Sequence, residues 1–192
     1  MSQVSLEQDQ EIIYNPAFLS RPEADHLLVK LEQELDWRQD EIQIYGRRVA
    51  IPRLQAFIAE PGLRYTYSGL TLEGRGFPAT LAKLQHQLSE HFQVRFNAVL
   101  ANLYRDGGDT MGWHSDDEPE LGPEPIIASI SLGAERSFKF RPKCGGTSWG
   151  LELQHGSLLF MGPGVQQRWQ HSVPKRSRCN QARINLTFRQ II

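Results

Sequence analysis

Two histidines and one aspartate are residues that could hold a metal ion. His114 and Asp116 are separated by one residue in His114-Ser115-Asp116, and His171 lies far downstream. In extended chain, residues i and i+2 point to the same face, so His114 and Asp116 could chelate one ion while Ser115 points away. Two imidazoles and one carboxylate leave three open positions, which non-haem Fe(II) uses to hold a bidentate organic acid and O₂. The third ligand, His171, must then come from another strand.

A segment near the end of the chain could bind the organic acid. Polar residues Arg183, Asn185, Thr187 and Arg189 alternate there with Ile184, Leu186 and Phe188, which is the period of a strand. One interpretation is an outer strand with a solvated polar face. In the other, Arg183 faces inward and its guanidinium pairs with the distal carboxylate of a dicarboxylic acid that chelates the metal. Asn185 and Arg189 could then orient the metal-proximal end.

The elements that must position these residues are helices first and strands later. A capping box at Ser20-Arg21-Pro22-Glu23 precedes apolar residues at helical spacing, so the sequence predicts a helix to about Leu35. A second helix is predicted from near Pro78 to about His91. Short apolar or alternating runs then occupy 96–104, 126–132, 137–141, 150–153, 157–161 and 182–191. Many short strands without intervening helices predict a mainly β domain with flanking helices, an α+β sandwich or barrel.

These motifs together resemble a known family. Asn102-Leu103-Tyr104, His114-Ser115-Asp116-Asp117-Glu118, His171 and the run Arg183 to Arg189 are similar to motifs of the AlkB family of Fe(II)/2-oxoglutarate dioxygenases. The resemblance is closest to nucleic-acid-repair members of the vertebrate 2 and 3 type and covers about residues 42–190. It implies a double-stranded β-helix core, a cupin-like jelly roll, with N-terminal helices and a nucleotide-recognition lid.

The resemblance also implies roles for individual residues. It makes His114, Asp116 and His171 the iron ligands and catalytic centre, and it pairs Arg183 with 2-oxoglutarate. The other positions that it assigns to the cosubstrate are Asn102, Tyr104, Asn185, Thr187 and Arg189. With Fe(II), 2-oxoglutarate and O₂, the implied reaction is oxidative demethylation of bases such as 1-methyladenine and 3-methylcytosine in DNA and also RNA. Formaldehyde, succinate and CO₂ are the expected products.

Other positions resemble the part of the family that faces the substrate. Tyr45-Gly46-Arg47 resembles a turn that carries an aromatic wedge in duplex-acting relatives, and Tyr65, Tyr67 and Ser68 resemble lid positions that contact a flipped base. A base that is acted on must leave the stack, and an aromatic face offsets part of that cost. With Tyr67 opposite His114, the base would be sandwiched. The alternative is that Tyr65 and Tyr67 only line the core of a hairpin.

Two further acids, Asp117 and Glu118, directly follow the metal motif. N-methylated adenine and cytosine carry a positive charge that the unmodified bases lack, so a carboxylate in a dry pocket would select the lesion. The alternative for either residue is a solvated loop acid like Glu120 and Glu124.

Length and charge favour one domain with an uneven charge distribution. At 192 residues the chain is expected to form a single domain (1–192), with an acidic helical extension (about 1–41), a lid (about 42–77) and a jelly-roll core (about 94–192). Residues 1–41 hold ten acids and three bases, whereas the rest holds twelve acids and eighteen bases. Basic clusters that could follow a phosphate backbone include Arg47, Arg48, Arg53, Arg64, Arg136, Lys139, Arg141, Lys143, Lys175, Arg176 and Arg178.

The remaining features predict a protein of the cell interior. No apolar run approaches the roughly 18 residues that span a bilayer, and the two cysteines, Cys144 and Cys179, cannot form a disulfide framework. We therefore expect a cytoplasmic monomer without membrane contact that binds nucleic acid, associated with the nucleoid if the source is bacterial and nuclear if it is eukaryotic. Two other interpretations stay open: the same chemistry on a protein side chain or small molecule, and a cupin-like binding module without turnover.

Overall fold

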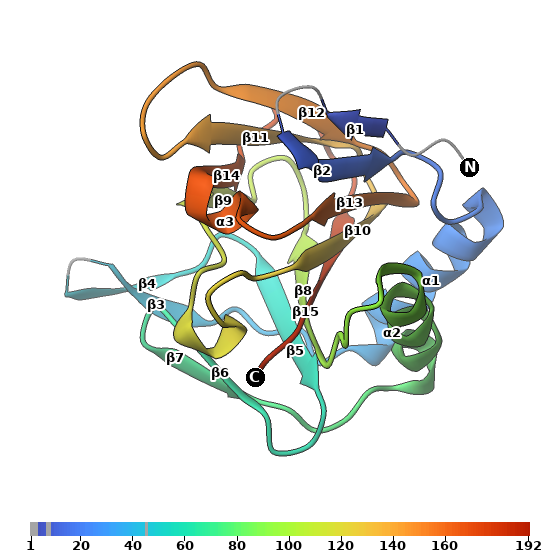
Figure 1. Cartoon of the computed structure of the whole chain (residues 1–192). Coiled ribbons are helices and arrows are strands. Elements are labelled where there is room, and N and C mark those ends of the chain that lie inside the picture. Colours follow the sequence, from blue (N-terminus) through green and yellow to red (C-terminus); the bar gives the residue numbers. More distant parts are fainter. Residues whose placement is uncertain (1–3, 7–8, 45) are drawn as a thin grey trace.

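Two antiparallel β-sheets form the core in the computed structural model, which describes residues 4–6, 9–44 and 46–192 (Figure 1). The large sheet has, in spatial order, β1 (Val4–Leu6), β2 (Asp9–Asn15), β13 (Ser157–Met161), β10 (Ile127–Gly133), β15 (Arg183–Arg189), β8 (Ala98–Tyr104) and β5 (Leu54–Ala59). The small sheet has β12 (Trp149–Leu153), β11 (Arg136–Pro142), β14 (Trp169–Val173) and β9 (Met111–His114). Apolar side chains of both sheets meet in one buried cluster between them, which gives the predicted jelly roll.

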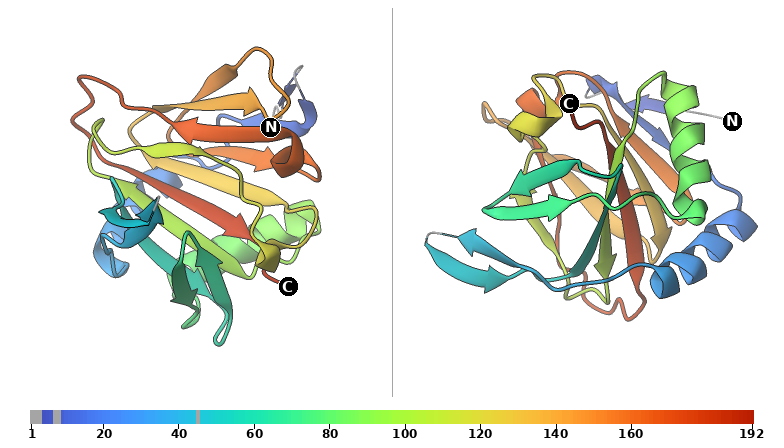
Figure 2. Two further views of the ribbon diagram at one scale, coloured as in Figure 1. Left: turned by 90° about the vertical axis from the view of Figure 1, so that its left-hand side faces the viewer. Right: turned by 90° about the horizontal axis from the view of Figure 1, so that it is seen from below.

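Two helices cover the outer face of the large sheet, α1 (Arg21–Glu34) and α2 (Ala79–Phe92), as Figure 2 shows. Leu31 of α1 and Leu84 of α2 belong to one buried cluster with Ile130 of β10 and Leu186 of β15. The Ser20 backbone N–H donates to the Glu23 carboxylate at the start of α1 (3.0 Å), as the capping box predicts. Both predicted helices are confirmed to within about two residues.

The segment before α1 is not simply helical, because β2 pairs with β13 as part of the large sheet. Ile12 of β2 is fully buried between the two sheets, and Ile13 packs on the helix side. The expectation of helices before strands therefore missed β2, whose partner lies more than 140 residues away along the chain. Such a pairing leaves only a short apolar run in the sequence, here Ile12-Ile13-Tyr14.

Two hairpins from the predicted lid segment project beside the edge strand β5 (Figure 2). They consist of β3 (Glu41–Ile44) with β4 (Arg47–Ala50), and β6 (Arg64–Tyr67) with β7 (Leu70–Glu73). The turn between β6 and β7 has two residues with positive φ, Ser68 at 46° and Gly69 at 78°. This conformation matches the twist of a hairpin and orients Tyr67 relative to β5. Two short helical segments, α3 (Val165–Arg168) and a 3₁₀ turn (Pro119–Leu121), complete the described chain.

Among the described residues, every helix is too short or too polar to cross a membrane.

Candidate active site

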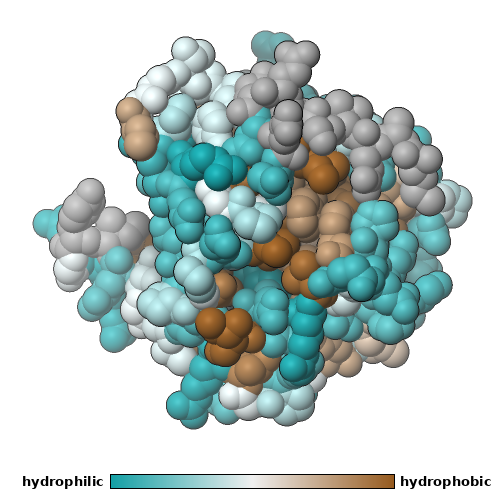
Figure 3. Space-filling model, viewed as in Figure 1, coloured by the Kyte–Doolittle hydropathy of each residue, from teal (hydrophilic) through white to brown (hydrophobic). Residues whose placement is uncertain are grey.

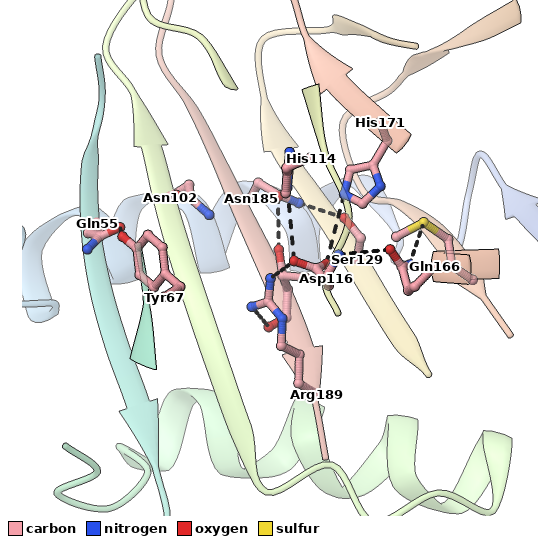
Figure 4. A network of polar contacts seen from close by, with 12 residues as sticks. Gln55, Tyr67, Asn102, His114, Asp116, Ser129, Gln166, His171, Asn185 and Arg189 are labelled. Carbon is pink, nitrogen blue, oxygen red and sulfur yellow. Dashed lines mark hydrogen bonds and ion pairs between the residues drawn. The ribbon is translucent and has the colours of Figure 1, made fainter. Parts of the chain in front are cut away.

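The three predicted metal ligands converge between the sheets. His114 of β9 pairs with His171 of the neighbouring strand β14, and Asp116 follows two residues after β9 ends. One donor atom from each lies within 4.8 Å of the other two. The Asp116 carboxylate lies 4.0 Å from His114 Nε2 and 3.9 Å from His171 Nε2 (Figure 4). The prediction that the third ligand comes from another strand is confirmed, because these donors surround a space that suits a metal ion.

Electrostatics keep these donors in the forms that bind a metal. Burial lowers the pKa of both imidazoles, and the pKa of His171 falls to about 3 with the help of the neighbouring His114. Burial opposes the charge of Asp116, but nearby positive charge, chiefly the guanidinium of Arg189, outweighs it and lowers the pKa of Asp116 to about 2. At neutral pH the site therefore holds two neutral imidazoles and one carboxylate, which need no deprotonation before they bind an ion.

Hydrogen bonds orient the two ligands of the His-x-Asp motif. His114 Nδ1 donates to the Gly112 carbonyl (2.9 Å), which leaves the Nε2 lone pair for a metal. The Ser115 hydroxyl points away and donates to the Trp169 carbonyl (2.9 Å), as the alternation predicts. The backbone N–H of Asp116 donates to the side-chain oxygen of Gln166 (3.0 Å), which lies on α3 and is 1% exposed. Sequence reasoning missed Gln166, because nothing in its local pattern marks it as a partner of Asp116.

Replacing Gln166 by leucine is expected to weaken metal binding by roughly 10- to 100-fold, the effect typical of losing an outer partner of a metal ligand. The buried Asp116 N–H would lose its acceptor, and the carboxylate would lose its fixed direction. Titration with Co(II), followed by its visible absorption, measures this affinity. Gln167→Leu is the matched control, because Gln167 donates to the Pro123 carbonyl on the surface. Equal affinities of the two variants would contradict the role.

The arginine strand β15 is central in the large sheet, between β10 and β8. All seven of its residues are buried. Ile184, Leu186 and Phe188 face the helices, and the polar residues on its other face point into the space between the sheets. The interpretation of a solvated outer strand is therefore wrong, because both faces of a central strand in this layered fold are covered.

Arg183 presents unsatisfied donors to the interior. Its side chain is 1% exposed, and its Nη2 donates to the Ser131 hydroxyl (2.9 Å). Nε and Nη1 have no hydrogen-bond partner in the described structure. Burial lowers its pKa to about 10, so the guanidinium still carries its charge at neutral pH. The Tyr104 ring lies 5.1 Å from it. A buried cation with two free donors suits a carboxylate, which can accept both.

The other polar residues of β15 form a chain toward the metal site. Asn185 donates to the Ser129 hydroxyl (2.7 Å) and to the Ile130 carbonyl (3.0 Å). The Thr187 hydroxyl donates to the Asn185 side-chain oxygen (3.1 Å). Arg189 Nη2 donates to the Asp116 carboxylate (2.7 Å), as Figure 4 shows. Arg189 therefore holds a metal ligand, while its Nε still has no partner within the described residues.

The predicted pair Asn102 and Tyr104 lies on β8 directly opposite Asn185 and Arg183 of β15. Both side chains therefore share the inner face with the arginine strand. The Asn102 side-chain oxygen accepts a hydrogen bond from Arg53 Nε (2.7 Å). This arginine belongs to the site and not to a surface cluster, because it is only 4% exposed.

Arg136 is the second arginine that the predicted basic clusters misplaced. It is 1% exposed, and it donates to the backbone carbonyls of Asp106, Asp109 and Pro174. It therefore holds loops together inside the protein. Charge patterning alone could not separate Arg53 and Arg136 from exposed basic residues.

The lid tyrosines lie at different depths. Tyr65 is 2% exposed and belongs to a small buried cluster, where its ring stacks on Phe57 and lies 5.5 Å from the Arg189 guanidinium. Tyr67 is half-buried, and its hydroxyl donates to the Gln55 side-chain oxygen. Figure 4 shows both side chains over the same face of the large sheet, Tyr67 beside β5 and β8 and His114 beyond β15, so the two rings lie apart. The core interpretation therefore fits Tyr65, whereas contact of Tyr67 with a base stays a prediction.

The remaining predicted substrate positions lie at the surface of the lid. Ser68, Gly46 and Arg47 are exposed. Tyr45 lies outside the described residues.

The two acids after the metal motif, Asp117 and Glu118, differ in exposure and in their partners. Asp117 is exposed, and its carboxylate pairs with Lys143 (2.9 Å). Glu118 is half-buried, and its Oε2 atom has no hydrogen-bond partner in the described structure. Burial and the charge of Asp116 raise the pKa of Glu118, whereas Arg189 lowers it. Of the two, Glu118 is therefore the carboxylate that can meet a cation at the site.

The chain matches proteins of known chemistry. Residues 11–189 match the family model of the 2OG-Fe(II) oxygenase superfamily. The chain is 41% identical over 186 residues to DNA oxidative demethylase ALKBH2 of Mus musculus, covering 90% of this chain and 77% of that protein. It is 40% identical over 190 residues to alpha-ketoglutarate-dependent dioxygenase alkB homolog 3 of Homo sapiens, covering 92% of this chain and 64% of that protein.

A solved structure is similar in fold. OsALKBH1 aligns with a TM-score of 0.65 at 18% identity, covering 94% of this chain and 98% of that one. At this identity the likeness concerns the jelly-roll fold alone. The donor set of two histidines and one aspartate, the unsatisfied buried arginine and the sequence matches agree. The chain belongs to the 2OG-Fe(II) oxygenase superfamily and, within it, to the AlkB homologues, and it is a dioxygenase that uses Fe(II), 2-oxoglutarate and O₂.

Proposed function

We propose that this dioxygenase removes methyl groups from N-alkylated bases, 1-methyladenine and 3-methylcytosine, in DNA and also in RNA. The observation that carries the proposal is Glu118, a half-buried carboxylate with an unpartnered oxygen two residues beyond the metal ligand Asp116. Such a group favours a cationic base over a neutral one. The names of the relatives, among them a DNA oxidative demethylase, support the same substrate class.

Different residues would bind the cosubstrate, the metal and the base. Arg183 would bind the distal carboxylate of 2-oxoglutarate, and Asn102 and Tyr104 would line the space beside it. His114, Asp116 and His171 would hold Fe(II). The bound metal, 2-oxoglutarate and O₂ supply the oxidation of an N-methyl carbon, which leaves as formaldehyde while 2-oxoglutarate becomes succinate and CO₂. The protein places the methyl group near the metal and keeps water from the buried donors.

The lid would hold the base once it has left the stack. Tyr67 offers a half-buried ring whose hydroxyl is held by Gln55, and the buried Tyr65 ring packs against it with the ring centres 5.8 Å apart. Stacking on an aromatic ring stabilises a bound base by about 1–3 kcal/mol, which offsets part of the cost of flipping. The 3₁₀ turn after Glu118 is tied to the lid, because the Thr66 backbone N–H donates to Glu120 (3.1 Å).

One assay tests the proposed function directly. The protein is incubated with Fe(II), 2-oxoglutarate and a matched panel of single-stranded DNA, duplex DNA and RNA that carry 1-methyladenine or 3-methylcytosine. Mass spectrometry is expected to detect the unmodified base together with formaldehyde and succinate. Succinate formation without loss of the methyl group from any oligonucleotide would instead favour a protein or small-molecule substrate.

Replacing Glu118 by glutamine is expected to lower kcat/KM for 1-methyladenine by roughly 10- to 100-fold, because a hydrogen bond to a charged group contributes about 1.5–3 kcal/mol. The neutral base 3-methylthymine is expected to be turned over with little change. The ratio of kcat/KM for the two bases in the same single-stranded sequence is the measurement. Asp117→Asn is the matched control, because Asp117 is exposed and paired with Lys143. Equal losses on both bases would contradict charge selection by Glu118.

A further inference from the structure

An exposed aromatic residue is the immediate sequence neighbour of a metal ligand. Trp113 immediately precedes the ligand His114 on β9, which is the edge strand of the small sheet. Successive side chains alternate between faces, so His114 points inward to the metal while Trp113 points outward. The Trp113 side chain is 37% exposed, and it is the one aromatic among the large apolar residues that the described structure exposes. The Trp113 ring has no role in binding the metal.

A cation without a counter-charge lies against this ring. The Arg141 guanidinium lies 4.6 Å from the centre of the Trp113 ring, and its Nε donates to the Gln170 side-chain oxygen (2.9 Å). Arg141 on β11 pairs with Gln170 on β14, so the arginine reaches across β14 to the edge strand. In the part of the chain that the structure describes, no carboxylate lies within ion-pair distance of Arg141, and its two terminal nitrogens donate to no other group.

The surrounding face of the small sheet is polar and basic. Lys139, two residues before Arg141, points to the same side, is exposed and forms no ion pair within the described residues. The side of the molecule that carries β11, β14 and β9 is predominantly hydrophilic in the space-filling view (Figure 3). An exposed indole with unpaired cations beside it is complementary to nucleic acid, which offers flat bases and an anionic backbone.

We propose that Trp113 and Arg141 bind the nucleotide that flanks the flipped base in a single strand, with the base on the indole and the phosphate on the guanidinium. This inference rests on the proposed function. Because β9 is an edge strand, no further strand of the described chain separates its inward face, which carries His114, from its outward face, which carries Trp113. A nucleic-acid strand that bends around this edge can therefore place neighbouring nucleotides on the two faces. Only an unpaired, unstacked flanking base can present its face to this outward ring, so the pair favours single strands over duplexes.

A series of substrates that differ in length tests the assignment. The substrates are 1-methyldeoxyadenosine monophosphate, a single-stranded pentamer with 1-methyladenine at its centre, and the same lesion in a duplex. Trp113→Ala is expected to reduce the preference for the pentamer over the mononucleotide about 5- to 140-fold, which corresponds to 1–3 kcal/mol of stacking. Trp113→Phe keeps an aromatic face and is expected to keep most of the preference.

The role of the Arg141 guanidinium is tested through the salt dependence of pentamer binding. Arg141→Gln is expected to lower the slope of log affinity for the pentamer against log salt by about 0.7, the value for one phosphate contact in a single strand. Fluorescence anisotropy with a labelled pentamer measures this slope. Binding of the unlabelled pentamer is also expected to quench tryptophan emission in the wild type and less in Trp113→Phe.

Matched controls lie on the helical side of the molecule. Val29→Ala removes a side chain that is 55% exposed, and Arg21→Gln removes an exposed arginine, both on α1. Neither variant is expected to change the preference for the pentamer over the mononucleotide or the slope of log affinity against log salt. Unchanged length preference in Trp113→Ala, an equal loss on the mononucleotide, or an equal loss on the duplex would each overturn the inference. Failure of the wild type to demethylate all three substrates would instead reject the proposed function itself.

Discussion

Replacing Asp116 by asparagine is expected to reduce turnover below detection and to weaken metal binding by more than the roughly 10- to 100-fold that loss of an outer partner causes. Asp116 is the sole carboxylate of the donor set, and its pKa of about 2 keeps it charged at neutral pH. Asparagine keeps an oxygen that can accept from Arg189 but removes the negative charge that faces the metal. The measurements are Co(II) affinity and formaldehyde release.

Stability must be separated from metal binding in this experiment. Asp116→Ala would leave the buried Arg189 guanidinium without its partner, and breaking such a pair costs about 3–5 kcal/mol of folding free energy. Asparagine avoids most of that loss, so its thermal unfolding is expected to stay close to that of the wild type. Asp117→Asn, one residue away and exposed, controls for the loss of one negative charge. Wild-type Co(II) affinity in Asp116→Asn would rule out Asp116 as a ligand.

Replacing Arg183 by methionine is expected to raise the KM for 2-oxoglutarate about 100-fold or more. Arg183 is 1% exposed and has two donors, Nε and Nη1, without partners in the described structure. A bidentate bond to the distal carboxylate would satisfy both, and charge-assisted hydrogen bonds contribute about 1.5–3 kcal/mol each. Succinate formation at increasing 2-oxoglutarate concentration gives the KM, with Fe(II) saturating.

A cosubstrate analogue makes this prediction specific. 2-Oxopentanoate keeps the metal-chelating end of 2-oxoglutarate but lacks the distal carboxylate. The wild type is expected to discriminate strongly between the two acids, and Arg183→Met is expected to lose most of this discrimination, as in a double-mutant cycle. Arg136→Met is the matched control, since Arg136 is equally buried but donates to backbone carbonyls. Undiminished discrimination in Arg183→Met would show that another residue binds the distal carboxylate.

For the strand at 183–189, the sequence predicted the secondary structure but not the surroundings of its polar face. Alternation predicted the strand almost to the residue, because the period of side chains along a strand is a local property. The same alternation could not say whether the polar face meets water or the interior. That depends on β15 pairing with both β10 and β8, whose positions in the chain are distant from it.

Residue type and spacing did not identify the residues that only support the site. Gln166 and Arg53 contact Asp116 and Asn102 across 50 and 49 residues of chain. Glutamine and arginine are common surface residues, so type and spacing give no reason to place them inside. Asp117 and Glu118, adjacent in sequence, differ in burial, and Glu118 directly precedes the 3₁₀ segment Pro119–Leu121 that packs beside the lid.

By itself, the sequence determined which atoms could hold the metal and the organic acid, because a His-x-Asp pair and an alternating arginine strand are local patterns with defined geometry. Only the tertiary structure decided how deep those atoms lie, which arginine has unsatisfied donors and which acid faces the site. Burial and partner choice arise from sheet pairings between distant segments, and they decide whether a charged group is solvated or directed at a ligand.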